Sequence, residues 1–291
     1  MKEIINKASV LIEALPYIQR FKGEKIVIKL GGSVMENDDL MQMTIRDIVF
    51  METVGMKPII VHGGGKAITA KMNEVGLETK FINGLRYTCE KTIEVVDDVL
   101  HNLINSEIVQ KAKKFGGKAH PISGKSFLKA KKKYTICSET GKKIDIGFVG
   151  EIISVNTKPI LRAIKQGLLP VIPPLACDSK KNIYNINADI AACHIAKALK
   201  ARKLVFISDV PGILLDPKDE STVISTIKES EINDLIKRKI ISGGMIPKVE
   251  SAIEALKAGT NKIHMIDGRI QHSLLLEIFT DKGIGTEIVR G

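Results

Sequence analysis

The sequence of 291 residues predicts an α/β fold built on a parallel, doubly wound sheet. Short β-branched runs over 26–30 and 58–62 end at glycines, which is typical of buried parallel strands. Helical patterns follow them over about 38–54 and 67–75, and the same alternation returns after residue 168. Strand–helix alternation at this spacing implies crossover connections, and these build a parallel sheet covered by helices.

Ahead of the first strand, apolar residues at helical spacing over 2–15 predict an amphipathic helix. Pro16 and Tyr17 are expected to disturb it, so that a second short turn over 17–21 leads into the strand. The helix would either pack on its own domain or dock on a neighbouring subunit, and the sequence leaves both alternatives open. We therefore treat residues 1–22 as a separate helical arm.

The middle of the chain is expected to differ from the βα pattern. Residues 83–88 are predicted to be a loop before a long helix that ends near Lys114. Alternating runs over 126–132 and 143–155 flank the turn-like Ser138-Glu-Thr-Gly141 and predict a hairpin. The alternation then resumes with strands over 168–172, 204–207 and 262–266 and helices over 188–199 and 247–257. A polar run near 175–185 favours a boundary between lobes 23–180 and 181–291.

The composition, 44% hydrophobic and 26% charged, indicates a soluble globular protein with an ample core. No apolar run is long enough to span a membrane, and residues 1–22 lack the apolar region of a signal peptide. We expect a cytoplasmic protein, or a stromal one if it serves a plastid. The cysteines lack metal-ligand spacing and are expected to be reduced; they are Cys89, Cys137, Cys177 and Cys193.

The formal net charge is +11, and the stretch 111–143 supplies most of the excess with eleven lysines and one acidic residue. A nucleic-acid-binding surface would combine such a stretch with aromatic residues or a recognisable motif, and aromatic residues are few here. We interpret the stretch as a solvated basic face that attracts anions. Ser123-Gly-Lys-Ser126 resembles the end of a Walker A loop but lacks the required upstream glycine.

Two glycine-tipped strands predict an anion site. Lys29 lies near the end of strand 26–30, beside Gly31 and Gly32, and burying a lysine is costly unless it meets an anion. Strand 58–62 leads into Gly63-Gly64-Gly65, where amides at a helix N-terminus would form an anion cradle. Because ligands bind beyond the carboxyl ends of parallel strands, both loops are expected to bind carboxylates and phosphates.

Two polar residue types add to this site. Arg86, in the 83–88 loop, offers a bidentate fork for a carboxylate, although most loop arginines are merely solvated. In an extended segment Asn185, Asn187 and Asp189 would share one face. Asp189 could instead simply cap the following helix, but that explanation leaves both asparagines without a role.

The C-terminal half supplies a lysine and a loop. Pro247 suits the first turn of a helix, so Lys248 lies at a helix N-terminus, where the dipole disfavours a cation. A lysine held there is expected to serve an anion. The Ser208-Asp-Val-Pro-Gly212 loop ends another apolar strand and is expected to bind a nucleotide.

Taken together, these motifs resemble those of the acetylglutamate kinases, in the amino-acid kinase superfamily. They occur in that family's order and cover nearly the whole chain. The matching stretches are Lys29-Leu-Gly-Gly32, His62-Gly-Gly-Gly65, Gly84-Leu-Arg86, Asn185-Ile-Asn-Ala-Asp189, Asp209-Val-Pro-Gly-Ile-Leu214 and Gly243-Gly-Met-Ile-Pro-Lys248. Tyr87, Cys89 and Ser208 depart from the family's usual residues.

The resemblance implies a three-layer αβα sandwich around an eight-stranded, mostly parallel sheet. It also implies phosphorylation of N-acetyl-L-glutamate by ATP with Mg²⁺ in arginine biosynthesis, without a tightly bound metal or organic cofactor. The acid would bind in the N-terminal half and ATP in the C-terminal half. The implied residues are Gly64, Gly65, Arg86 and Asn185 for the acid, Lys29, Lys248 and Asp189 for catalysis, and Gly31, Gly32, Ser208, Asp209 and Gly212 for the nucleotide.

Chemistry agrees with these roles. The nucleophile is a carboxylate that is ionised at neutral pH, so no general base is required. The reaction instead needs two anions aligned and the transferred charge compensated. His62 ends a strand, and we interpret it as a structural residue and not as a base.

The resemblance also implies regulation. Arginine-inhibited members of the family carry an N-terminal helix, through which three dimers form a hexamer. They share a pattern that corresponds here to Tyr17, His264, Glu277 and Gly283, and Glu277 would pair with the guanidinium of L-arginine. The alternative is that His264 merely ends a strand and Glu277 is solvated. The sequence leaves open whether a PII signalling protein is a further partner, whereas no nucleic acid or membrane is expected.

Other functions remain as alternatives to these predictions. A kinase of the same fold could act on acetylaminoadipate, glutamate or aspartate. From a different class, the lysines of 111–143 could serve a basic nucleic-acid-binding or regulatory protein.

Overall fold

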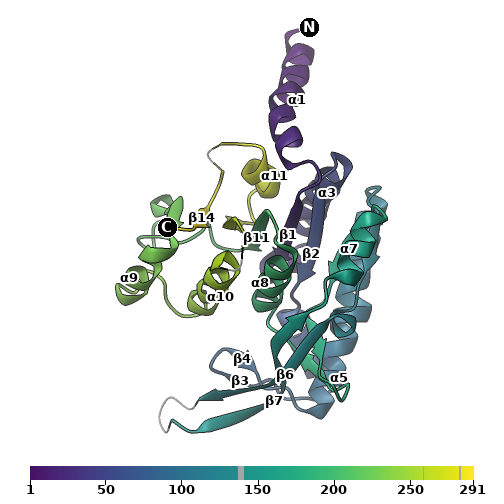
Figure 1. Cartoon of the computed structure of the whole chain (residues 1–291), viewed down its shortest axis with the longest axis vertical. Helices are drawn as coiled ribbons and strands as arrows, with labels where there is room; N and C mark the ends of the chain where they lie inside the picture. Colours follow the sequence, from purple (N-terminus) through teal and green to yellow (C-terminus); the bar gives the residue numbers. More distant parts are fainter. Residues whose placement is uncertain (137–140, 258, 282) are drawn as a thin grey trace.

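The computed structural model describes residues 1–136, 141–257, 259–281 and 283–291 (Figure 1). Its main sheet has eight strands, and every neighbouring pair is parallel except β13 with β14. Across the sheet these are β12 (Thr226–Lys228), β14 (Thr286–Val289), β13 (Lys262–Asp267), β11 (Lys203–Ser208), β1 (Lys25–Leu30), β2 (Lys57–His62), β8 (Leu169–Ile172) and β5 (Ala119–Pro121). The predicted mostly parallel sheet is confirmed.

Helices cover both faces of this sheet. The α-helices are α1 (Lys2–Phe21), α2 (Gly32–Glu36), α3 (Asp38–Thr53), α4 (Gly65–Glu74), α5 (Glu90–Asp98), α6 (Ser106–Lys114), α7 (Lys158–Lys165), α8 (Ala188–Leu199), α9 (Ile232–Lys237), α10 (Met245–Lys257) and α11 (Ser273–Ile278). Between α5 and α6 the chain forms a π-helix, η1 (Val99–Asn105). Short 3₁₀ turns are η2 (Gly124–Ser126), η3 (Glu220–Thr222) and η4 (Glu229–Glu231).

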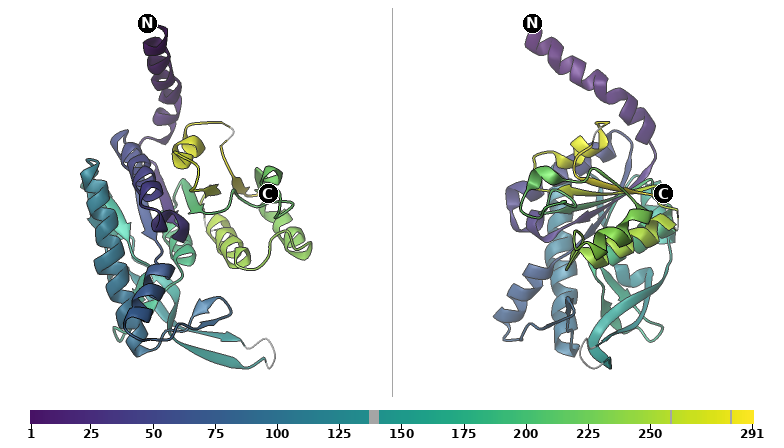
Figure 2. Two further views of the ribbon diagram at one scale, coloured as in Figure 1. Left: turned by 180° about the vertical axis from the view of Figure 1, so that it is seen from behind. Right: turned by 90° about the vertical axis from the view of Figure 1, so that its left-hand side faces the viewer.

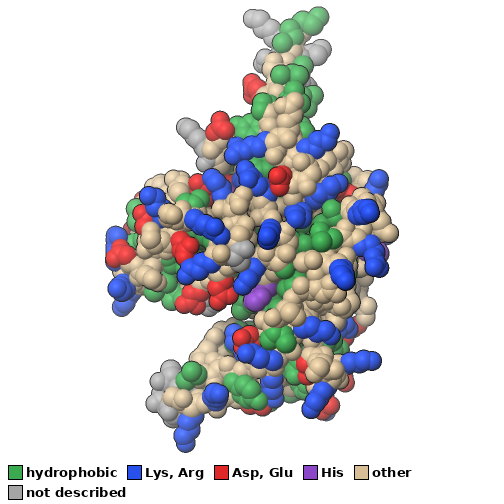
Figure 3. Space-filling view, viewed as in Figure 1, with side chains coloured by type: hydrophobic (Ala, Val, Ile, Leu, Met, Phe, Trp, Pro, Cys, Tyr) green, Lys and Arg blue, Asp and Glu red, His purple; other side chains and the backbone are tan. Residues whose placement is uncertain are grey.

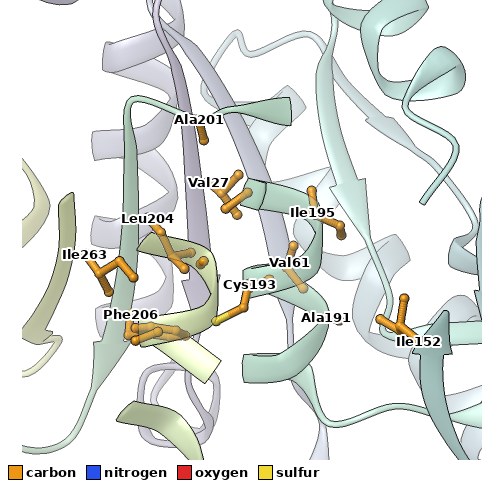
Figure 4. Close-up of a cluster of buried hydrophobic side chains, with 14 of the residues drawn as sticks. Val27, Val61, Ile152, Ala191, Cys193, Ile195, Ala201, Leu204, Phe206 and Ile263 are labelled. Atoms are coloured by element: carbon orange, nitrogen blue, oxygen red, sulfur yellow. The ribbon is translucent and has the colours of Figure 1, made fainter. Parts of the chain in front are cut away.

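The side chains of β1 show why the fold has three layers. Successive residues of a strand point to opposite faces. Val27 therefore lies in a cluster with side chains of α8 and α10, whereas Ile26 and Ile28 lie in another cluster with side chains of α3 and α5. Figure 4 shows the first cluster, where Val27, Val61 and Phe206 of the sheet meet Ala191 and Ile195 of α8. The predicted three-layer sandwich follows from this alternation.

Two smaller sheets lie outside the main one. The predicted hairpin is present as β6 (Leu128–Ile136) and β7 (Lys143–Val155), which close into a four-stranded barrel with β9 (Leu175–Cys177) and β10 (Ile183–Asn185). Part of its predicted turn, at 138–140, lies outside the described residues. The other sheet is a small hairpin of β3 (Phe81–Ile82) and β4 (Leu85–Arg86).

Two local predictions were wrong. α1 is one helix that continues through Pro16, because an exposed helix loses only one internal hydrogen bond there and water can satisfy the freed carbonyl. It projects away from the sheet in all views (Figures 1 and 2). The stretch 83–88 is not simply a loop, since Asn83 and Gly84 form the turn of the β3–β4 hairpin. Within the described residues, no helix is long and apolar enough to cross a membrane.

Candidate active site

A cavity of about 530 Å³ lies at the carboxyl ends of β1, β2 and β11. This is where an open parallel sheet places its ligands. Its lining comes from both halves of the chain and includes Lys29, Gly31, Gly32, Gly63, Gly64, Gly65, Lys66, Phe81, Arg86, Leu100, Asn185, Asn187, Ser208, Asp209 and Lys248. The fold thus brings together most of the residues that the sequence predicts.

One carboxylate holds two lysines of this cavity. The Lys29 Nζ lies 2.9 Å from Oδ1 of Asp189, and the Lys248 Nζ lies 3.8 Å from Oδ2 of the same side chain. All three side chains are mostly buried, with 11, 20 and 15% exposed for Lys29, Lys248 and Asp189. Because one negative charge faces two positive charges, the cluster keeps a net charge of about +1 in a poorly solvated place. Such a cluster attracts a further anion.

The N-terminus of α8 explains why Asp189 is free for this task. Asn187 caps the helix, with its side-chain oxygen accepting from the amides of Asp189 and Ile190 at 2.8 and 3.1 Å. The alternative in which Asp189 is the cap is therefore wrong. Asp189 is instead a first-turn residue, where the helix dipole favours its charge. Asn185 lies at the end of β10 and lines the cavity with Asn187.

The glycines of the two loops are required for different structural reasons. A Cβ at Gly31 would lie 2.4 Å from the carbonyl oxygen of Ile207, so β1 and β11 could not end side by side. A Cβ at Gly64 would lie 2.6 Å from Ile104 and 2.7 Å from Leu100, both in η1. Gly65 faces open space and begins α4, whose first amides have no partner within the helix. An anion can therefore approach these amides.

Arg86 is a buried cation with neutral partners. Its guanidinium donates to the Gly65 carbonyl and the Thr69 hydroxyl at 2.8 Å each, and it lies 4.8 Å from the centre of the Phe81 ring. Among the described residues no acidic side chain pairs with it, and burial lowers the pKa of the guanidinium. A buried charge without a counter-ion is costly. A carboxylate ligand in the adjoining cavity would supply the missing charge.

His62 has structural hydrogen bonds, in agreement with its interpretation as a structural residue and not as a base. Its ring is fully buried, its Nδ1 lies 2.9 Å from the Gly63 carbonyl, and its Nε2 lies 3.1 Å from the amide nitrogen of Asn105. Since that amide can only donate, Nε2 accepts and Nδ1 carries the proton. Burial lowers the pKa of the ring to about 4, so His62 is neutral at pH 7.

The predicted nucleotide residues are only partly brought together. Ser208 ends β11, and it lines the cavity together with Asp209, Gly31 and Gly32. Gly212 lies elsewhere, against Thr286, whose hydroxyl would be 2.5 Å from an added Cβ. Gly212 has a φ angle of +151°, which favours glycine, and its contact with Thr286 of β14 leaves no room for a side chain. A glycine is therefore needed where the chain runs close to β14. We therefore do not place Gly212 in the cavity wall.

Sequence reasoning missed several residues of the cavity. Lys66 pairs with Glu36 and so joins α4 to α2 beside the cavity. Phe81 and Leu100 supply apolar wall, the former from a two-residue strand and the latter from a π-helix. Lys66 directly follows the predicted glycine loop, which is the signal that could have revealed it. Nothing comparable marks Phe81 or Leu100 in the sequence.

A second cavity, of about 590 Å³, lies between α1, β13 and α11. It is lined by all four residues predicted for the regulatory site: Tyr17, His264, Glu277 and Gly283. Glu277 is 5% exposed, so the alternative of a solvated glutamate is wrong. Tyr17 packs edge-on against Phe279, and a hydrogen bond to Asp281 raises the pKa of its hydroxyl.

The Glu277 carboxylate already has partners in this cavity. It lies 3.1 Å from the Lys203 Nζ and 2.6 Å from the His264 Nδ1, and it accepts from the Ile284 amide at 3.0 Å. Burial alone would raise the pKa of Glu277, but His264 and Lys203 hold it below its ordinary value. Burial lowers the pKa of His264, and its Nε2 is buried without a hydrogen-bond partner. Lys203 was not predicted from the sequence.

The cysteines form no metal-binding cluster among the residues that the structure describes. Cys89, Cys177 and Cys193 are free thiols, while Cys137 lies outside the described residues. Among the ion pairs between described residues, lysines of the basic stretch 111–143 that pair with carboxylates include Lys111, Lys125, Lys131 and Lys132. These lysines are therefore paired with acidic side chains, whereas the sequence predicted a solvated basic face. Figure 3 shows Lys and Arg side chains scattered over this face, with acidic side chains between them.

Comparisons with known proteins agree with this geometry. The chain matches the amino acid kinase family over residues 24–267. It is 50% identical to an acetylglutamate kinase of Carboxydothermus hydrogenoformans, over 98% of this chain and 99% of that one. A second acetylglutamate kinase, of Heliobacterium modesticaldum, is 46% identical over 100% of both chains.

A solved structure extends the likeness to three dimensions. The N-acetylglutamate synthase of Neisseria gonorrhoeae, in complex with coenzyme A and N-acetyl-glutamate, superposes with a TM-score of 0.85 at 25% identity. The match covers 98% of this chain and 63% of the synthase chain. The full-length relatives, the fold and the cavity residues point the same way, and the chain therefore belongs to the amino acid kinase family, among the acetylglutamate kinases.

Proposed function

We propose that this protein transfers the γ-phosphoryl group of ATP to the side-chain carboxylate of N-acetyl-L-glutamate, forming N-acetyl-L-glutamyl 5-phosphate for arginine biosynthesis. The observation that carries the proposal is the arrangement of cations in one cavity. Lys29 and Lys248 share Asp189, and Arg86, which lines the same cavity, has no acidic partner among the residues that the structure describes. This suits a reaction that brings two anions together.

The roles follow from position. Lys29 and Lys248 would contact oxygens of the transferred phosphoryl group, and Asp189, which pairs with both, would orient them. Arg86 would bind a carboxylate of the acid, with Asn185 and the amides of Gly64 and Gly65 beside it. Gly31, Gly32, Ser208 and Asp209 would contact the nucleotide. We assign residues 23–180 to acid binding and dimerisation, and 181–291 to ATP binding.

Magnesium would enter with ATP. Mg²⁺ in such kinases is held largely by phosphate oxygens and water, with one or two carboxylates. Among the described residues no cluster of three or more metal-ligating side chains exists. Asp189 is engaged by two lysines and Glu36 by Lys66, so among the described lining carboxylates Asp209 would face the nucleotide metal. Bound there, the ion would neutralise phosphate charge.

The activity is tested by trapping the acyl phosphate with hydroxylamine. The purified protein is incubated with ATP, Mg²⁺ and one acid at a time: N-acetyl-L-glutamate, acetylaminoadipate, glutamate or aspartate. We expect hydroxamate chiefly with N-acetyl-L-glutamate. Preference for an unacetylated acid, or for acetylaminoadipate, would instead assign one of the neighbouring kinase activities. The curated relatives, which are acetylglutamate kinases, favour the expected result.

We also propose that L-arginine binds the second cavity and inhibits the enzyme. Neutral His264 donates from Nδ1 to Glu277, which leaves its buried Nε2 as an acceptor for an N–H group of the ligand. The predicted pairing of Glu277 with a guanidinium requires displacement of Lys203, which lies 3.1 Å from the carboxylate. The guanidinium of arginine would then replace the Lys203 ammonium group as the cation that pairs with Glu277.

Assembly through α1 completes the proposal. Its apolar side chains at 5, 10, 11, 12 and 15 are 44–68% exposed, and such a surface is usually buried in an assembly. A hexamer built as a trimer of dimers would cover it with a second copy of the helix. Control by a PII signalling protein stays a prediction, as does a cytoplasmic location.

A further inference from the structure

The β3–β4 hairpin forms part of the cavity wall. Phe81, Leu85 and Arg86 line the cavity, and the first and last of these are paired across the two strands. The hairpin is a separate two-stranded sheet with two residues in each strand. A hairpin this small is barely stable by itself in water, so its position depends on contacts with the rest of the chain.

Its base is fixed to the barrel. The Thr88 amide donates to the Ile146 carbonyl at 3.1 Å, and the Phe148 amide donates to the Thr88 carbonyl at 2.6 Å. Thr88 is fully buried and follows the hairpin after one residue, Tyr87. These contacts hold the point where the hairpin leaves the barrel, but the turn lies at its opposite end.

The tip is fixed by one side chain. The amide of Asn83 donates to the Thr135 hydroxyl at 2.9 Å and to the Ile136 carbonyl at 2.8 Å, both on β6. Figure 1 shows β3 and β4 beside the β6–β7 hairpin at this place. Asn83 is thus bound to residues more than fifty positions away in sequence.

The turn itself does not require this contact. Asn83 and Gly84 have φ angles of 50° and 74°, as a two-residue hairpin turn with two left-handed residues requires. Glycine would meet the same backbone demand at position 83 without strain. The side chain therefore adds a connection that the backbone conformation alone does not explain.

We propose that Asn83 is a positioning residue for the phosphoryl acceptor: it ties the β3–β4 hairpin to β6 and so holds Arg86 and Phe81 against the bound acid. The inference rests on the proposed function and extends it to a residue outside the cavity lining. Asn83 acts through the hairpin, so its loss weakens acid binding. The residues proposed to contact the nucleotide lie at the carboxyl ends of β1 and β11 and outside the hairpin, so we expect nucleotide binding to be unaffected.

The test compares Asn83→Gly, which keeps the turn and removes the connection, with the wild type. Two exposed hydrogen bonds are lost, and we expect the KM for N-acetyl-L-glutamate to rise about five- to tenfold, with the KM for ATP and kcat nearly unchanged. Thr135→Val, which removes one acceptor, should have a smaller effect and add nothing in the Asn83→Gly background. Equal increases in both KM values, or no increase, would overturn the proposal.

A second measurement does not depend on turnover. Amide hydrogen exchange over 81–88 should be faster in Asn83→Gly than in the wild type, and exchange over 26–30 should be unchanged. Unchanged exchange at the hairpin would contradict the connection. If the wild type itself forms no hydroxamate with N-acetyl-L-glutamate, the proposed function has failed, and the exchange result still decides whether Asn83 holds the hairpin.

Discussion

Asp189 illustrates how one residue can organise a site. Its carboxylate contacts Lys29 and Lys248, which come from β1 and α10, more than two hundred residues apart. Without it, two ammonium groups would repel each other in a poorly solvated cavity. With it, both lysines are held together and the cluster keeps a net positive charge, which in the proposed reaction would face the phosphoryl group. Their contribution should therefore be greatest in the transition state.

Kinetics separates these lysines from Arg86. We expect Lys29→Ala and Lys248→Ala each to lower kcat by about 10²–10³, with little change in the KM for the acid, because their contacts strengthen as charge is transferred. Arg86→Ala should chiefly raise the KM for N-acetyl-L-glutamate, because it removes the bound carboxylate's partner. Steady-state assays with each substrate varied measure both effects. Lys66→Ala is the matched control on the same cavity, and it should change kcat only slightly.

An exchange of the two patterns would contradict the assigned roles. If Arg86→Ala lowered kcat alone while the lysine variants raised only the KM for the acid, the cations would have the opposite functions. The comparison is informative because all four side chains line one cavity, so general damage to the cavity would affect them alike.

Much of the site could be predicted at the residue scale. Glycines after strands and a lysine at a helix N-terminus can be explained from the local sequence. These patterns identified Lys29, Gly64 and Lys248, which line the cavity. Lys203 was missed because its role depends on Glu277, 74 positions away. Gly212 does not line the cavity, and its contact with the nucleotide stays a prediction, because a glycine in a turn has the same sequence signal whether it faces a ligand or a neighbouring strand.

At the scale of elements, prediction succeeded where the hydrophobic pattern extended over several residues. Five strands of the main sheet, β1, β2, β8, β11 and β13, and helices α3 and α8 were predicted nearly in place, whereas the short strands β5, β12 and β14 were not predicted. The β3–β4 hairpin was missed because strands of two residues have no measurable alternation. The π-helix was read as part of a continuous helix, although it places Leu100 and Ile104 against Gly64. Its wider turn leaves no signature in residue type.

The arm α1 provides the prediction at this scale. Deletion of residues 1–21 should leave an active dimer that L-arginine no longer inhibits, because both Tyr17 and the helix surface are lost. Phe21 is buried at the base of the arm, with the Lys203 Nζ 5.5 Å from its ring centre, so a shorter deletion of 1–15 is the necessary control. That variant keeps Tyr17 and Phe21 and should also sediment as a dimer.

Together the two deletions separate assembly from arginine binding. Sedimentation measures the size of each variant, and inhibition curves measure its response to arginine. The 1–15 deletion should bind arginine in isothermal titration, while the 1–21 deletion should bind it weakly, since Tyr17 lines the cavity. An intact protein that sediments as a dimer and retains full activity in millimolar arginine would refute the regulatory proposal.

For the whole molecule, the central feature is one continuous sheet shared by both halves of the chain. β1 pairs with β2 on one side and with β11 on the other, so the two halves of the chain, which we propose bind the acid and the nucleotide, meet at its carboxyl end. His62 lies at this junction. Its neighbour Asn105 also donates to the Val171 carbonyl at 3.1 Å, which joins β2, η1 and β8 through one buried network.

The buried His62 should make global stability depend on pH. Its folded-state pKa is about 4 against an ordinary value of 6.5, so between these values the unfolded chain binds a proton that the folded chain does not. Stability therefore falls as the pH falls from about 6.5 to about 4, by roughly 3 kcal/mol from this residue. Burial also lowers the pKa values of His194 and His264, which contribute in the same direction.

Replacement of His62 measures how much this residue contributes to the pH dependence of the free energy of unfolding. His62→Asn removes the titrating ring and keeps a donor near the position of Nδ1, so its free energy of unfolding should vary less between pH 4 and 6.5 than that of the wild type. Urea unfolding at several pH values measures this slope directly. His120→Gln is the control, because His120 is exposed and its replacement should leave the slope unchanged. Equal slopes for His62→Asn and the wild type would show that His62 takes up its proton as readily in the folded chain as in the unfolded chain, contrary to the burial and hydrogen bonding described above.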